Sequence, residues 1–177
     1  PMQTITTIGF DIAKSVFQVH GVDATGRVVV RRQLKRRYVL AFFQKLPPCL
    51  VGIEACASSH HWSREIQALG HTVRLMPPAY VKPYVKRQKN DATDAEAICE
   101  AVTRANIRFV PTKTPDQQSG LLLHRTRHLF IRQQTAVINA IRGHLAEFGI
   151  VAPVGRHGVE ELLNVVADPS DRRVPEM

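Results

Sequence analysis

The sequence predicts an α/β protein built on one mixed sheet and followed by a long helical arm. Three observations predict this class. Three β-type segments open the chain, two more strand-like segments alternate with helical ones, and a long stretch with helical apolar spacing comes after them. The 177 residues suffice for one domain with its own core and an appendage.

The first three strands are expected in the segments "TITTIGFDIA", "SVFQVHGVD" and "GRVVVRRQL". The first is rich in Thr and Ile, and the second alternates apolar and polar residues. The turn "DATG" precedes the third. Because short turns join these segments, they predict an antiparallel meander.

Helices and strands alternate from residue 36 onward. A helix over 36–46 ends at Pro47-Pro48, the apolar run 49–55 reads as a buried strand, and a helix over 59–70 leads to a strand over 71–76. Strands separated by helices run parallel through right-handed crossovers. A sheet that begins as a meander and continues as β-α-β has the arrangement of the RNase H-like fold.

The remaining segments are basic or helical. The stretch 77–90 predicts a basic loop or broken helix, and a helix over 91–106 carries an apolar stripe of Ala95, Ile98 and Val102. A long basic helix is expected over 116–148, with an apolar seam that suits either a coiled-coil arm or packing within the domain. We therefore expect three parts: an RNase H-like domain over 1–110, the arm over 111–150, and a linker or truncated further domain over 151–177.

Charge indicates the class of partner. The formal net charge of +9 favours a polyanionic partner, although membrane-surface binding or a merely basic soluble protein fits the charge too. No apolar run is long enough to span a bilayer, and no signal peptide opens the chain. The three cysteines form no CxxC pair, so we expect reduced, buried thiols and a cytoplasmic location.

The stretch "KNDATDAEAI" carries two aspartates with two possible roles. Asp91 and Asp94 suit the cap and first turn of a helix, where negative charge is favourable. Alternatively, two carboxylates on one helical face can hold a divalent metal. These ten residues alone favour the cap.

Two more carboxylates shift the balance toward metal binding. Asp11 and Glu54 follow apolar residues in segments expected at the centre of the sheet, and a lone buried carboxylate is costly. Strands one and four are neighbours in this fold, so Asp11 and Glu54 would face each other and a cation would relieve their repulsion. With Asp91 and Asp94, they predict a site for one or two Mg²⁺ or Mn²⁺ ions.

The residues "IGFDIAKS", "VGIEA" and "KNDATDA" together resemble the N-terminal catalytic domain of DEDD-type insertion-sequence transposases. These recombinases are related to pilin-gene invertases and carry a domain like that of the RuvC Holliday-junction resolvases. The resemblance covers about residues 3–150, and the family's four acids fall on Asp11, Glu54, Asp91 and Asp94.

The resemblance implies a DNA transposase or site-specific recombinase that cleaves and transfers DNA strands. It also implies a homodimer or higher oligomer through the arm, a structured RNA encoded by the element as a partner, and a second domain with a nucleophilic serine. This chain ends before that domain, so the alternatives are a non-catalytic nucleic-acid-binding and dimerising fragment or a resolvase-like nuclease. An actin-like phosphotransferase would need Gly-rich phosphate loops, which "FDIAKS" and "IEACAS" do not supply.

Basic residues near these acids and on the arm are candidate DNA contacts. They are Lys14, Lys82, Lys86, Arg87, Lys89, Arg125, Arg127 and Arg132. The His124/His128 pair has metal-like spacing, but it stands among arginines and is expected to be exposed. Ser58 and Ser59 fit helix capping better than nucleophilic catalysis.

Overall fold

The computed structural model describes residues 4–85 and 91–174. The chain divides into two compact units, Pro1–Pro115 and Asp116–Met177. No helix in the described part of the chain is both long and apolar enough to cross a membrane.

The first unit is built on one five-stranded sheet with the order β3-β2-β1-β4-β5. β2 pairs antiparallel with both β1 and β3. On the other side of β1, β4 pairs parallel with both β1 and β5. The strands are β1 (Thr7–Asp11), β2 (Val16–Val22), β3 (Val28–Lys35), β4 (Leu50–Glu54) and β5 (Thr72–Met76). This topology confirms the predicted mixed, RNase H-like sheet.

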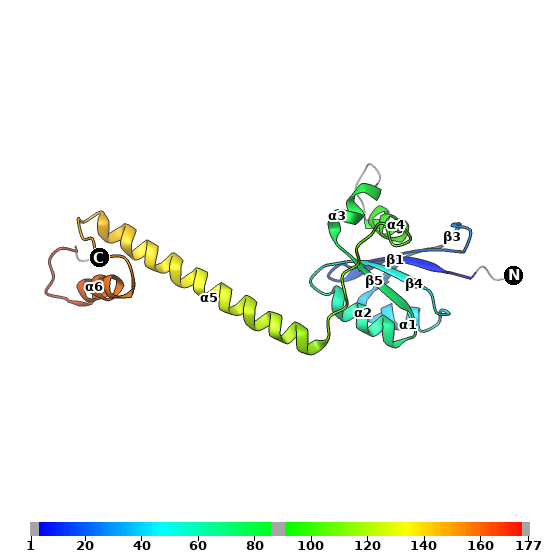
Figure 1. Ribbon diagram of the computed structural model, residues 1–177, viewed down its shortest axis with the longest axis horizontal. Helices are drawn as coiled ribbons and strands as arrows, with labels where there is room; N and C mark the ends of the chain where they lie inside the picture. Colours follow the sequence, from blue (N-terminus) through cyan, green and yellow to red (C-terminus); the bar gives the residue numbers. More distant parts are fainter. Residues whose placement is uncertain (1–3, 86–90, 175–177) are drawn as a thin grey trace. The chain divides into compact units, whose positions relative to one another are not determined.

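Helices cover both faces of the sheet. Figure 1 shows α1 (Val39–Phe43) and α2 (Ser59–Ala68) on one face and α4 (Asp91–Ala101) on the other. The expected helix over 36–46 is shorter, because a 3-10 turn, η1 (Arg36–Tyr38), forms its start. The basic segment forms two short turns, α3 (Pro78–Val81) and η2 (Lys82–Tyr84).

An aromatic core fills the face beneath α1 and α2. Phe10 stacks on Phe17 with ring centroids 5.4 Å apart, and Phe43 and Trp62 meet it edge-on at 5.3 and 6.3 Å. All four side chains are buried. Since side chains alternate along a strand, Phe10 on this face sends Gly9 and Asp11 to the opposite face.

Two glycines allow α4 to lie directly on the other face. A Cβ at Gly9 would overlap the Ala95 carbonyl oxygen and the Cys99 backbone nitrogen, and a Cβ at Gly52 would lie 2.8 Å from Cβ of Val102. The expected stripe of Ala95, Ile98 and Val102 is buried, as predicted. The helix ends at Ala101, earlier than the expected residue 106.

The second unit contains α5 (Pro115–Ala146) and α6 (Arg156–Ala167). Leu145, Ile150 and Leu162 form its buried core. Arg142 fastens the connecting loop, because it donates to the carbonyl oxygens of Ala152 and Pro153 at 2.9 and 2.7 Å. The apolar seam of α5 therefore packs within the unit only near its C-terminal end.

The cysteines are free thiols, as expected, but they are not all buried. Cys49 and Cys99 lie in the core, whereas Cys56 is exposed in the loop after β4. The prediction of buried packing was wrong for Cys56 because it follows the end of the strand, where the chain leaves the sheet.

Candidate active site

Asp11 and Glu54 end neighbouring parallel strands at the same edge of the sheet. The β1–β4 register pairs Phe10 with Ile53, and Asp11 and Glu54 are the next residues on each strand. Each follows a glycine by two positions, so both carboxylates lie on the face that α4 covers. Both are partly buried.

The direction of α4 brings its first turn to the same edge. Sγ of Cys99 lies 3.8 Å from the carbonyl oxygen of Thr7, and Ala95 covers Gly9, so α4 runs antiparallel to β1. One helical turn rises about 5.4 Å and two strand residues about 6.6 Å. The next turn toward the start of α4 therefore reaches the level of Asp11.

Asp94 completes a shared pocket with the two strand carboxylates. Asp11, Glu54 and Asp94 line one cavity of about 640 Å³, together with Lys82. Pro78, Ala79 and Val85 supply the apolar part of its wall. Asp91 is the first residue of α4, and its side chain lies outside what the structure describes.

The pocket fits a hard divalent cation by donor type. Its acidic groups are carboxylates, which Mg²⁺ and Mn²⁺ prefer over nitrogen or sulfur. Among the side chains that the structure describes, no three His, Cys, Asp or Glu lie close enough to hold a metal together. The three carboxylates thus share a pocket without forming a closed coordination shell.

The predicted basic contacts fall into three places. Lys82 lines the carboxylate pocket, and Lys14 is exposed in the turn after β1. Lys86, Arg87 and Lys89 lie outside the described residues. Tyr80 and Tyr84, which flank Lys82 in the sequence, are partly buried and pack against the core under α4, so they are not free to stack on bases.

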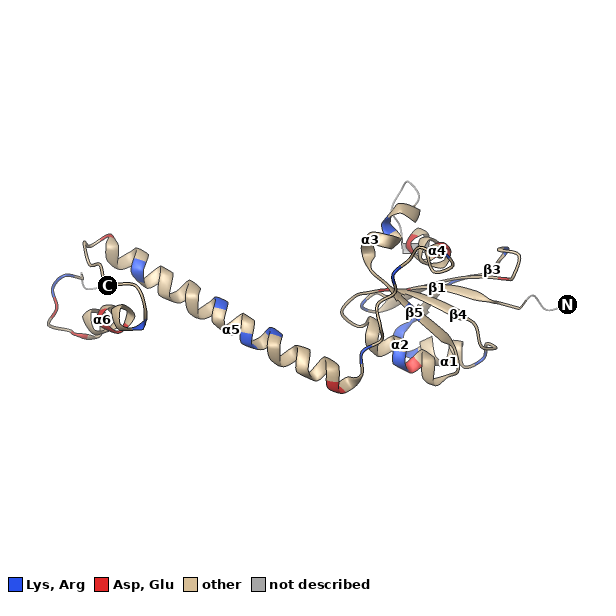
Figure 2. Ribbon diagram, in the orientation of Figure 1, with Lys and Arg blue, Asp and Glu red and all other residues tan. Residues whose placement is uncertain are grey.

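The three predicted contacts on α5 are exposed along the helix. Arg125, Arg127 and Arg132 are all exposed, and Figure 2 shows blue segments along α5 with red at its start, where Asp116 lies in the first turn. No Asp or Glu occurs between residues 117 and 146. The helix is therefore a strongly basic surface within its own unit.

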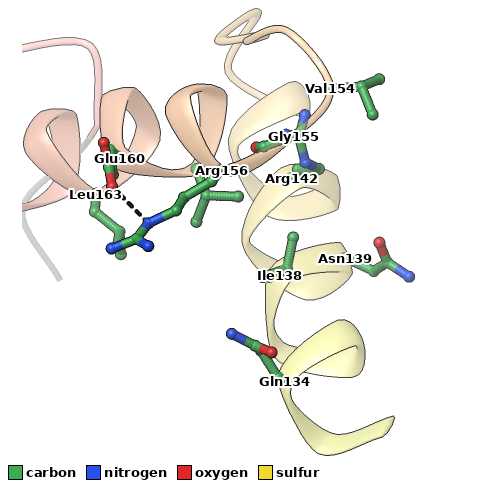
Figure 3. Close-up of a pocket in the computed structure, with 10 residues that line it drawn as sticks. Gln134, Ile138, Asn139, Arg142, Val154, Gly155, Arg156, Glu160 and Leu163 are labelled. Carbon is green, nitrogen blue, oxygen red and sulfur yellow. Dashed lines mark hydrogen bonds and ion pairs between the residues drawn. The ribbon is translucent and has the colours of Figure 1, made fainter. Parts of the chain in front are cut away.

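A second cavity, of about 760 Å³, lies between the end of α5 and α6. One of the two arginines that line it, Arg156, forms an ion pair with Glu160 at 3.0 Å (Figure 3). Arg142, on its other side, holds the carbonyls of the loop. The cavity is thus a feature of the packing between the two helices rather than an anion site.

Other reactive-looking groups have structural roles. Nδ1 of His71 lies 3.4 Å from Sγ of Cys49, which imitates a catalytic pair, but burial raises the pKa of this thiol to about 11. Nδ1 of His71 accepts the Cys49 N–H at 3.3 Å and Nε2 lies 3.0 Å from the Phe43 carbonyl, so the imidazole bridges the backbone. Ser58 is the N-cap of α2 but makes no side-chain capping bond.

Sequence reasoning missed one polar residue beside the carboxylates. Gln18 pairs directly with Asp11 across β1 and β2, and therefore lies on the same face. The pattern that could have revealed it is a glutamine between two buried apolar residues in "FQV".

Comparisons with known proteins identify the relatives of the chain. A family model described as a transposase, of the DEDD_Tnp_IS110 type, matches residues 8–150. A "Probable family 20 transposase" of Pseudomonas aeruginosa is 55% identical over 92% of this chain and 48% of that protein. The transposase of insertion sequence element IS1111A from Coxiella burnetii is 40% identical over 99% of this chain and 49% of that protein.

Among solved structures, T. thermophilus RuvC in complex with a Holliday junction substrate matches with a TM-score of 0.43 and 11% identity. The match covers 60% of this chain and 99% of that chain. The chain spans about half the length of the curated relatives it matches.

Proposed function

Because the chain belongs to the IS110-type DEDD transposase family, we propose that its first unit supplies the metal-binding carboxylates of a DNA strand-cleavage and strand-transfer site. The observation that carries this proposal is the pocket that Asp11, Glu54 and Asp94 share. Asp91 joins as the fourth carboxylate, since it lies one helical turn before Ala95 at the start of α4.

The carboxylates would hold one or two Mg²⁺ or Mn²⁺ ions, which activate a nucleophile and stabilise a leaving oxygen at phosphorus. Asp11 and Glu54 are fixed by the sheet, and Asp94 by the packing of α4 on Gly9 and Gly52. Lys82, on the wall of the same pocket, contacts a phosphate of the bound strand and orients it toward the carboxylates.

A calorimetric titration of the chain with Mg²⁺ or Mn²⁺ tests this proposal. Loss of even an outer-shell partner costs roughly 10- to 100-fold in metal affinity, so Asp11→Asn, Glu54→Gln and Asp94→Asn should each cost at least that. Glu65→Gln, a matched change on the opposite face of the sheet, should leave the affinity unchanged. Equal affinity in all variants would refute the metal site.

The basic surface of α5 is proposed to bind DNA or the structured RNA of the element through phosphates. Each neutralised phosphate contributes about 0.9 to the slope of log affinity against log salt for duplex DNA. Replacing Arg125, Arg127 and Arg132 by Gln should flatten the slope, whereas Arg27→Gln, in an exposed turn of the first unit, should not. A slope unchanged by the triple substitution would exclude phosphate contacts at α5.

A second candidate function is non-catalytic: the chain dimerises and binds nucleic acid without cutting it. The favouring observation is that Leu123, Phe130 and Val137, spaced by sevens on α5, are 73%, 62% and 58% exposed. A second copy of α5 would cover this seam. Light scattering should give a dimeric mass that Phe130→Glu reduces to a monomer, and a monomeric parent at high concentration would exclude this dimer.

A further inference from the structure

A polar floor extends from the carboxylate pocket across β2 and β3. The register pairs Asp11 with Gln18 and Gln18 with Gln33, so the three side chains form one row on the α4 face. The next row holds Gly9, His20 and Arg31. α4 packs on this second row, where Glu96 pairs with Arg31 at 3.5 Å.

This floor is hollowed into a cavity of its own. Gln18, His20, Arg31 and Gln33 line a pocket of about 210 Å³ on β2 and β3. Neighbouring strands lie about 4.8 Å apart, so Gln33 is roughly 10 Å from Asp11 and Gln18 about half as far. A DNA strand in a duplex rises about 3.4 Å per nucleotide. The row from Asp11 to Gln33 is therefore as long as two or three nucleotides next to a phosphate held at the carboxylates.

Gln18 carries the argument for a ligand. The residue is only 6% exposed, and its amide, which makes no hydrogen bond within residues 4–85 and 91–174, still reaches solvent. The amide therefore keeps its contact with water, and a ligand that displaces this water has to replace its hydrogen bonds. The amide lines the pocket, so a molecule bound there would be its partner.

The chemistry of the pocket favours a nucleobase over a phosphate. Its paired side chains at the carboxylate end, Gln18 and Gln33, are neutral and both donate and accept hydrogen bonds. Arg31 is already paired with Glu96, and Arg32, which also lines the pocket, pairs with Val19 in the register and so points to the other face of β3. A glutamine amide suits the donor and acceptor edge of adenine, which it can contact through two hydrogen bonds.

We propose that Gln18 and Gln33 form a base-reading subsite for a nucleotide next to the phosphate at the carboxylates, with a preference for adenine. The proposal rests on the nucleic-acid function proposed above and adds a specificity determinant to it. The two glutamines contact the base, while the carboxylates and Lys82 face the phosphate.

Fluorescence anisotropy with labelled single strands of about 12 nucleotides, oligo-dA and oligo-dT, tests the subsite. The parent should bind oligo-dA about fivefold or more tightly, as one bidentate contact predicts. Gln18→Leu and Gln33→Leu should remove the preference without changing the salt slope, because they remove no charge. Gln67→Leu, on the exposed surface of α2, is the matched control and should keep the preference for oligo-dA.

The outcomes separate this proposal from its premise. A parent that binds both strands equally, or leucine variants that keep the preference, overturns the subsite while leaving the metal and phosphate contacts in place. A parent that binds neither strand removes the nucleic-acid function, and the subsite with it. Gln33→Leu guards against misfolding of the Gln18 variant, since Gln33 is exposed and a thermal melt will confirm that the fold is intact.

Discussion

The contact of α4 with Gly9 and Gly52 gives a prediction that joins the fold to the site. In Gly9→Ala, the new methyl group would overlap backbone atoms, the Ala95 carbonyl oxygen and the Cys99 nitrogen. Backbone atoms in a helix cannot rotate aside, so the whole helix must move. In Gly52→Ala, the methyl group would lie 2.8 Å from Cβ of Val102, an overlap smaller than that at Gly9, which a small shift of the backbone after the end of α4 relieves.

The magnitudes follow from that difference. Overpacking a core costs typically about 1–3 kcal/mol and occasionally more, so Gly52→Ala should fall in this range and Gly9→Ala above about 3 kcal/mol. A domain is stable by only about 5–15 kcal/mol, so Gly9→Ala removes a large part of the total. It should also weaken metal binding, because α4 carries Asp94.

Urea unfolding followed by circular dichroism measures these losses. Val102→Gly removes the Cβ that the new methyl group would meet, so the double variant Gly52→Ala/Val102→Gly should be more stable than the sum of its single changes predicts, by roughly 0.5–3 kcal/mol. Gly120→Ala, where nothing lies within 4 Å of the added Cβ, serves as a control and should not destabilise. A Gly9→Ala variant with the parent's unfolding midpoint would refute the close packing of α4.

Four further predictions concern the thiols, a buried histidine and the second unit. Cys56 should react with a thiol reagent in the native protein, whereas burial raises the pKa of Cys49 and Cys99 from 9.0 to about 11 and should protect them until the chain unfolds. Because the unfolded chain releases these two protons at lower pH than the folded one, the free energy of unfolding should fall as pH rises from about 9 to 11 in a pH series of urea melts. His71→Leu leaves the buried Cys49 N–H without a partner, while the Phe43 carbonyl keeps the Leu46 N–H, and should cost roughly 1–3 kcal/mol; an unchanged urea midpoint would contradict the bridge. Gly158→Ala should loosen the second unit, because its Cβ would overlap the Pro153 carbonyl oxygen; unchanged hydrogen exchange in α6 would argue against this contact.

The central sheet was predictable because its pattern is local. In "GFD" and "GIE", a glycine and an acid two residues apart share a face, and the spacing holds wherever the strand forms. The end of α4 was less predictable, because Thr103 and the residues after it keep a helical composition while the chain turns back toward β5. The exposure of Cys56 depended on where β4 ends. The place of Gln18 beside Asp11 depended on the pairing of β1 with β2, which neither segment reveals by itself.

The proposed metal site would also link ion binding to the attachment of one helix. Two of the described carboxylates belong to the sheet and the third to α4, so an ion held by all three binds only while α4 is docked. By mass action, such an ion at 100 times its dissociation constant would favour the docked helix by about 2.7 kcal/mol. Amide exchange in α4 would then slow with added Mg²⁺ more than exchange in β2 or β3, and the helix would report on the occupancy of the site.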